Sequence, residues 1–181
     1  MSAGAAVVDL SAIAANVRAV AAAARTDVMA VVKADGFGHG AAAVARAAVG
    51  AGATWLGVTS AAEALELRAA GLTAPILSWL HPAGEDFGRL VAGRVDIGVS
   101  SVVHLHAVAA AGARSGTPAV VQLKADTGLS RNGAAGQEWL DLVAWAGKYE
   151  REGSVAVRGV WSHLADAETP GAASLVRQVS A

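Results

Sequence analysis

Polar side chains that could do chemistry recur where apolar runs of the sequence end. Lys33 closes the run AVVK, Lys124 and Asp126 lie at the end of AVVQLKAD, and His163 lies near the end of VAVRGVWSHL. The carboxyl ends of parallel strands carry the active sites of barrels and open α/β sheets, so these residues are candidates for one site. Taken singly, each could simply leave the core for solvent, but their joint placement favours a site.

The lysine at position 33 comes just before a glycine-rich segment, GFGHG, at residues 36–40. Emergence into a partly closed site would favour the neutral amine, which can form a Schiff base with an aldehyde cofactor such as pyridoxal phosphate. Glycines beside it would let the backbone approach a bound group. Lys124 and Asp126 are two residues apart, so both are expected on the same face of a strand.

A dinucleotide site is the first alternative for the glycine-rich segment. Gly36, Gly38 and Ala41 fit a loose form of the dinucleotide-binding fingerprint. However, the residues KAD separate the apolar run from the first glycine, and the next run, TWLGVTS, ends without the acidic residue that would bind a ribose. A Walker-type phosphate loop fits less well, because no Gly-Lys-Ser/Thr follows.

Composition excludes several classes of protein. The 181 residues are 54% hydrophobic, but no stretch of eighteen residues lacks charged or strongly polar groups, so no membrane span is expected. A net charge of −1 provides no electrostatic footprint for nucleic acid or anionic lipid. The absence of cysteine excludes a disulfide framework and thiolate metal sites. We therefore expect a cytoplasmic protein with a small-molecule partner and no metal.

Six apolar, β-branched runs alternate with alanine-rich segments of helical periodicity. The runs predict strands at residues 28–33, 54–60, 75–80, 95–100, 119–126 and 155–164. A leading helix is also expected, with Ser11 as its N-cap. Nearly continuous hydrophobic runs are typical of parallel strands covered on both faces, which leaves an open doubly wound sheet or a (β/α)₈ barrel. A complete barrel needs about 250 residues, so a barrel here would be a truncated one.

Three segments in order resemble the signatures of the alanine racemases. AVVKADGFGHG is similar to the pyridoxal-phosphate signature of that family, VQLKADTGLSRNG (121–133) to its second signature, and VWSHLADAETP (160–170) to its third. The framing segments match as well, most closely in the style of actinobacterial members. The resemblance implies a TIM-type barrel truncated after about six βα units. Residues 1–181 would then be a partial N-terminal domain without the last barrel strands and the C-terminal β domain.

The resemblance also implies roles for five residues. Lys33 would carry pyridoxal phosphate and act as one of two bases. Arg131 would lie beside the cofactor ring and bind the substrate carboxylate, and His163 would pack against the pyridine ring. Lys124 matches a position that is often carbamylated in the family. Phe37 replaces the usual tyrosine that contacts the phosphate, and the loss of one hydrogen bond should weaken cofactor binding by about 0.5–3 kcal/mol.

The implied activity is the pyridoxal-phosphate-dependent interconversion of L-alanine and D-alanine by a homodimeric isomerase that supplies D-alanine for peptidoglycan. The family's second base is a tyrosine of the C-terminal domain, and Tyr149, in a predicted helix at 137–152, is no candidate for it. The chain alone is therefore expected to have little activity. Two alternatives stay open: another enzyme of the same cofactor fold, such as an amino-acid decarboxylase or another racemase, and a non-catalytic pyridoxal-phosphate-binding fragment.

Other polar residues have simpler interpretations. His104 and His106 are two apart on a predicted helix and face different directions, which indicates a solvated helix rather than a metal pair. Glu63 and Glu66, with Arg68 nearby, are expected on a solvated helix face. Asp126 is expected to shape the turn that follows its strand rather than to act as an acid or base.

Overall fold

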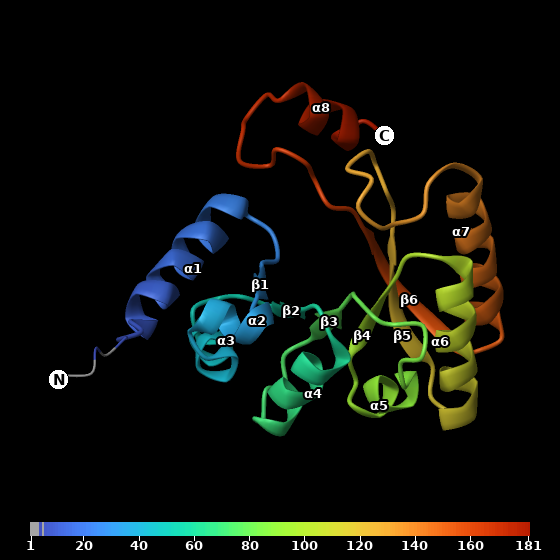
Figure 1. Ribbon diagram of the computed structural model, residues 1–181, viewed down its shortest axis with the longest axis horizontal. Helices are drawn as coiled ribbons and strands as arrows, with labels where there is room; N and C mark the ends of the chain where they lie inside the picture. The colour runs from blue at the N-terminus through green and yellow to red at the C-terminus, as the bar shows by residue number, and fades with distance from the viewer. Residues whose placement is uncertain (1–3, 5) are drawn as a thin grey trace. The chain divides into compact units, whose positions relative to one another are not determined.

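The computed structural model describes residue 4 and residues 6–181, and it divides into two compact units, Met1–His81 and Pro82–Ala181 (Figure 1). Each unit holds three parallel strands that neighbour one another in chain order. Helices follow the strands, so the chain runs through six βα units. Parallel pairing and the α/β class are as the sequence predicts. That residues 1–181 form one partial barrel domain stays a prediction.

The N-terminal unit is built around short strands with buried branched side chains. Leu56 pairs with Ala30 on one side and with Ile76 on the other, and both Leu56 and Ile76 are fully buried. The elements of this unit are α1 (Leu10–Ala24), β1 (Met29–Val31), α2 (Lys33–Gly38), α3 (Ala41–Gly50), β2 (Trp55–Val58), α4 (Ala61–Ala69) and β3 (Ile76–Ser78).

The C-terminal unit has longer strands and a clear helical layer. Its elements are α5 (Phe87–Ala92), β4 (Asp96–Val99), α6 (Val102–Ser115), β5 (Ala119–Lys124), α7 (Gly136–Arg151), β6 (Val155–Trp161) and α8 (Ala173–Val179). Helices α6 and α7 lie side by side along β5 and β6 (Figure 1). Leu105 and Val108 of α6 and Val121 of β5 are fully buried in the layer between helices and strands.

All six strands lie within the predicted runs. Most of them are shorter than the predicted runs, because residues at the ends of the runs belong to loops. The predicted N-cap of α1 was wrong: Asp9, not Ser11, caps the helix. The Asp9 carboxylate accepts hydrogen bonds from the backbone N–H of Ser11 and of Ala12, at 2.9 and 3.1 Å. A carboxylate two residues earlier reaches the first turn better than the hydroxyl of Ser11, which instead donates to that carboxylate. No helix within the described part of the chain is long and apolar enough to cross a bilayer.

A glycine brings α6 against the first rung of the β5–β6 ladder. A Cβ added to Gly112 would lie 2.0 Å from the carbonyl oxygen of Ser154 and 3.0 Å from the backbone nitrogen of Ala119. The N–H of Ala119 donates to that same carbonyl, at 3.0 Å. The helix can therefore approach the strands this closely only because position 112 has no side chain.

We expect Gly112→Ala to lower the free energy of unfolding by about 1–3 kcal/mol, because a backbone carbonyl cannot rotate away from the new methyl group. The matched control is Gly147→Ala in α7, where the nearest atom to an added Cβ is the Arg151 guanidinium at 3.5 Å. That change should leave stability unaltered or raise it by about 0.5–1 kcal/mol. Urea denaturation of both variants makes the comparison, and equal stabilities would contradict the steric argument.

Candidate active site

Arg131 and His163, from the segments that follow β5 and β6, meet in the C-terminal unit. Nη2 of Arg131 lies 2.6 Å from Nε2 of His163. Arginine only donates hydrogen bonds, so Nε2 of His163 is the acceptor, and the imidazole is neutral with its proton on Nδ1. Both side chains are exposed. The pair therefore presents a cation whose direction is set by a neighbouring ring.

Lys124, at the end of β5, contacts the backbone of Arg131 and is only 5% exposed. Its Nζ donates to the backbone carbonyl of Arg131 at 3.1 Å and lies 4.8 Å from the ring centroid of Trp161. Burial lowers the pKa of Lys124, and the positive charge of Arg131 lowers it further, while Asp126 opposes the shift. Lys124 thus links the end of β5 to the backbone of Arg131, and its pKa is lower than that of an exposed lysine.

The turn between Lys124 and Arg131 is organised by Asp126. Its carboxylate accepts the backbone N–H of Gly128 at 3.0 Å and of Ser130 at 2.9 Å. These two bonds are the main reason that the pKa of Asp126 is lowered. The prediction that Asp126 shapes the turn presenting Arg131 is confirmed.

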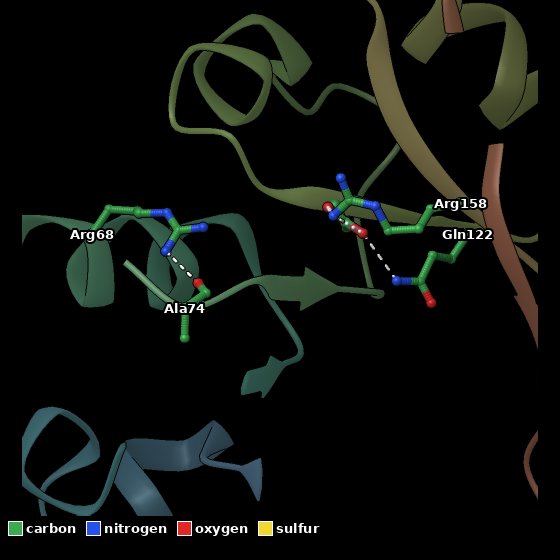
Figure 2. A network of polar contacts seen from close by, with 5 residues as sticks. Arg68, Ala74, Gln122 and Arg158 are labelled. Atoms are coloured by element: carbon green, nitrogen blue, oxygen red, sulfur yellow. Dashed lines mark hydrogen bonds and ion pairs between the residues drawn. The ribbon is translucent and has the colours of Figure 1, made fainter. Parts of the chain in front are cut away.

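A second polar cluster joins the three strands of this unit. The carboxylate of Asp96, which is 2% exposed in β4, accepts Nη1 of Arg158 at 2.9 and 3.1 Å and Nε2 of Gln122 at 3.0 Å (Figure 2). Arg158 precedes Gly159 at an irregularity of β6, where the pairing register shifts. Gln122 and Lys124 are two residues apart on β5, so they share a face. The cluster fixes the strand that carries Lys124.

Lys33 and Phe37 belong to the N-terminal unit. Lys33 follows β1 after the buried Val32, and its side chain is exposed among the described residues. Among the described strands β1 pairs with β2 alone, and Val31 is 53% exposed. A partly closed surrounding of Lys33 stays a prediction. Phe37 is 88% exposed. The two groups of predicted site residues therefore lie in different units.

The segment after Lys33, α2, is a left-handed turn. Four consecutive residues, Ala34, Asp35, Gly36 and Phe37, have φ between 52° and 61° and ψ between 37° and 50°. This conformation costs about 1–2 kcal/mol for each residue with a side chain. Polar contacts offset part of the cost: the Asp35 carboxylate accepts the N–H of Ala41 at 2.7 Å. Glycine removes the cost at position 36, which explains part of the glycine-rich sequence.

Glu63, at the start of α4, binds the first residue of this left-handed turn. One carboxylate oxygen accepts the N–H of Ala34 at 2.8 Å. The other accepts the N–H of Thr59 and of Ser60, both at 2.9 Å, and the Thr59 hydroxyl at 2.8 Å. In return the Ser60 hydroxyl accepts the N–H of Glu63 at 3.2 Å, which completes a capping box.

The pKa of Glu63 reflects these contacts. Partial burial acts to raise it, but the hydrogen bonds from Ala34, Ser60 and Thr59 outweigh burial and lower it to about 2. The predicted solvated face was therefore wrong for Glu63. It was wrong for Arg68 too, which donates to the carbonyl of Ala74 at 2.7 Å (Figure 2). The sequence signal was present as Ser60 followed three residues later by Glu63, a spacing typical of capping boxes.

The two histidines of α6 were also wrongly expected to be solvated. The ring of His104 lies 5.1 Å from that of Phe87. Nδ1 of His106 lies 2.9 Å from the Tyr149 hydroxyl, and its ring lies edge-on 4.7 Å from Trp145. Aromatic residues of α5 and α7 cover these rings, which helical periodicity alone does not reveal. Among the described residues, no three histidine, cysteine or acidic side chains are grouped to hold a metal ion.

We expect Glu63→Gln to lower the free energy of unfolding by about 1–3 kcal/mol at neutral pH, because its amide nitrogen would face backbone donors. The pKa of Glu63 is about 2 in the folded chain against an ordinary 4.5, so its contribution is present above pH 4.5 and is lost as pH falls from there toward 2. The difference between variant and wild type should shrink across that window in urea denaturation. Glu66→Gln, exposed on the same helix, is the control; a difference independent of pH would contradict the assignment.

Comparison with known proteins finds one family that matches nearly all of the chain. The family model described as alanine racemase, N-terminal domain, matches residues 8–181. The alanine racemase of Frankia casuarinae is 49% identical over 175 residues, which are 96% of this chain and 46% of that relative. The alanine racemase of Mycobacterium ulcerans is 50% identical over 166 residues, which are 91% of this chain and 43% of that relative.

A solved structure agrees with this match. The crystal structure of alanine racemase from Streptomyces lavendulae superposes with a TM-score of 0.93 at 47% identity, covering 96% of this chain and 46% of that one. The chain thus spans about half the length of the relatives it matches. Its six βα units have the fold of the TIM-barrel domain of these enzymes. The predicted resemblance is confirmed, and the chain belongs to the alanine racemase family through that family's N-terminal domain.

Proposed function

We propose that this chain is the cofactor-bearing part of a pyridoxal-phosphate-dependent racemase that interconverts L-alanine and D-alanine and so supplies D-alanine for peptidoglycan. The observation that carries the proposal is the pairing of Arg131 with His163, together with the hydrogen bond from the buried Lys124 to the backbone of Arg131. Three named positions of the family signatures thereby form one constellation. Curated relatives about half identical to this chain act as further support.

The donor groups of the chain fit pyridoxal phosphate. Lys33 offers an exposed primary amine to the aldehyde, and Arg131 offers a directed cation beside a neutral imidazole. Phe37 brings no hydroxyl to the phosphate, so that group would rely on other donors. When bound, pyridoxal phosphate withdraws electrons from the Cα of an amino acid and makes its proton removable.

Each residue then has a physical task. The amine of Lys33 would bind the cofactor and would accept the Cα proton on one face. Arg131 binds the substrate carboxylate. His163, as a hydrogen-bond acceptor, orients the Arg131 guanidinium. Racemisation also needs a proton carrier on the opposite face. The Tyr149 hydroxyl already contacts His106 between α6 and α7, so we propose that this carrier comes from outside the chain, in a homodimer.

Covalent trapping tests the role of Lys33. Intact protein incubated with pyridoxal phosphate and then reduced with borohydride should gain the mass of the reduced cofactor on the peptide containing Lys33. Lys33→Ala should lose this label and reduce D-alanine formation by at least about 10³-fold. Lys148→Ala, which removes an exposed lysine of α7, should keep both.

The outcomes separate the proposal from its alternatives. A label that persists in Lys33→Ala would remove that residue from its role. Labelling of the intact protein without D-alanine formation would favour a non-catalytic cofactor-binding protein, and release of carbon dioxide from an amino acid would favour a decarboxylase.

We also propose that Lys124 becomes carbamylated. Burial and the charge of Arg131 lower its pKa, which favours the neutral amine that would add carbon dioxide to give a carbamate and one released proton. The negative carbamate would then attract the Arg131 guanidinium. In ¹³C-bicarbonate, the protein should show a carbamate ¹³C resonance that grows as pH rises and is absent in Lys124→Met. If the resonance persisted in Lys124→Met and were lost in Lys148→Met, the assignment would be overturned.

A further inference from the structure

A buried glutamine of α8 joins the two segments that carry Arg131 and His163. Gln178 is 6% exposed and is the buried residue of this helix. Its Oε1 accepts the backbone N–H of Ala165 at 2.7 Å. Its Nε2 donates to the carbonyl of His163 at 3.0 Å and to the Thr127 hydroxyl at 3.1 Å. The acceptor and both donors of the amide are therefore used.

The three contacts reach two different loops. Thr127 lies in the turn after β5, next to Asp126, and Ala165 lies in the segment after β6. Because the Thr127 oxygen accepts from Gln178, its own hydrogen can point to Ser162, whose Oγ lies 2.7 Å away. The result is a hydrogen-bonded chain from α8 through the turn after β5 to the residue before His163. Fully satisfied buried networks of this kind fix one arrangement of the segments they join.

We propose that Gln178 is a positioning residue that keeps the Arg131 turn and the His163 segment in register, so that the 2.6 Å contact between these side chains forms. Its effect on substrate binding rests on the proposed function, but the alignment of the two loops does not. An amide is suited to the position because it supplies one acceptor and two donors without charge. Glutamate would place a negative oxygen against the His163 carbonyl, and leucine would leave the Ala165 N–H without its acceptor.

Hydrogen exchange of the intact protein tests the alignment directly. In Gln178→Leu, peptides covering 126–134 and 162–166 should both exchange at least about tenfold faster than in the wild type. Arg177→Leu is the matched control, because it makes the neighbouring, exposed position of α8 apolar; it should leave both peptides unchanged. Faster exchange confined to α8, or no change in either loop, would overturn the proposal.

Kinetics distinguish positioning from a general loss of structure. Gln178→Leu should raise the KM for alanine by about 10- to 100-fold while cofactor trapping on Lys33 is retained. Gln178→Glu should approach wild-type KM as pH falls, because the protonated carboxyl again has a hydrogen to donate. The ratio of the KM of Gln178→Leu to that of the wild type should stay constant over the same pH range. Equal KM values, or no recovery of Gln178→Glu, would contradict the role in substrate binding. If the wild type forms no D-alanine, the proposed function fails, and hydrogen exchange still decides whether Gln178 aligns the loops.

Discussion

The burial of one lysine shapes the C-terminal unit. A buried amine nitrogen needs a hydrogen-bond partner, and Nζ of Lys124 donates to the backbone carbonyl of Arg131. That contact fixes the backbone from which the arginine side chain extends, while the head of the arginine stays exposed. The polar cluster of Asp96, Arg158 and Gln122 holds the strand that carries Lys124. The same short turn therefore has a rigid backbone and an accessible arginine side chain.

In both units a carboxylate accepts hydrogen bonds from the backbone N–H groups of a turn or helix start. Asp126 gathers the backbone N–H groups of the turn that leads to Arg131, and Glu63 gathers those of Ala34 and of its own helix start. In each case the carboxylate is occupied by backbone donors. Its lowered pKa keeps it ionised, so it supports the geometry and is poorly suited to accept a proton. Both carboxylates therefore have a structural role in their own unit.

Much of the fold could be predicted from the sequence because the signals are local. Each strand is a compact apolar run, and Asp126 lies within four residues of the N–H groups that it binds. Contacts between distant positions could not be predicted: Glu63 and Ala34 are 29 residues apart, and Gln178 and Thr127 are 51 apart. Nothing near either residue in the sequence indicates which loop it reaches. The helix α5 was also not predicted, because six residues are too few to show periodicity.

The left-handed turn after Lys33 has a consequence for chemical protein synthesis. Ala34 has φ of 52° and ψ of 50°, values that are unfavourable for an L-residue and ordinary for its enantiomer. A D-alanine installed at position 34 by peptide ligation would have its methyl group on the unhindered side of the backbone. It would relieve about 1–2 kcal/mol of conformational strain without altering the Lys33 side chain. The position next to Lys33 in this racemase-family chain is thus one where the opposite stereoisomer of alanine fits the backbone better than the natural one.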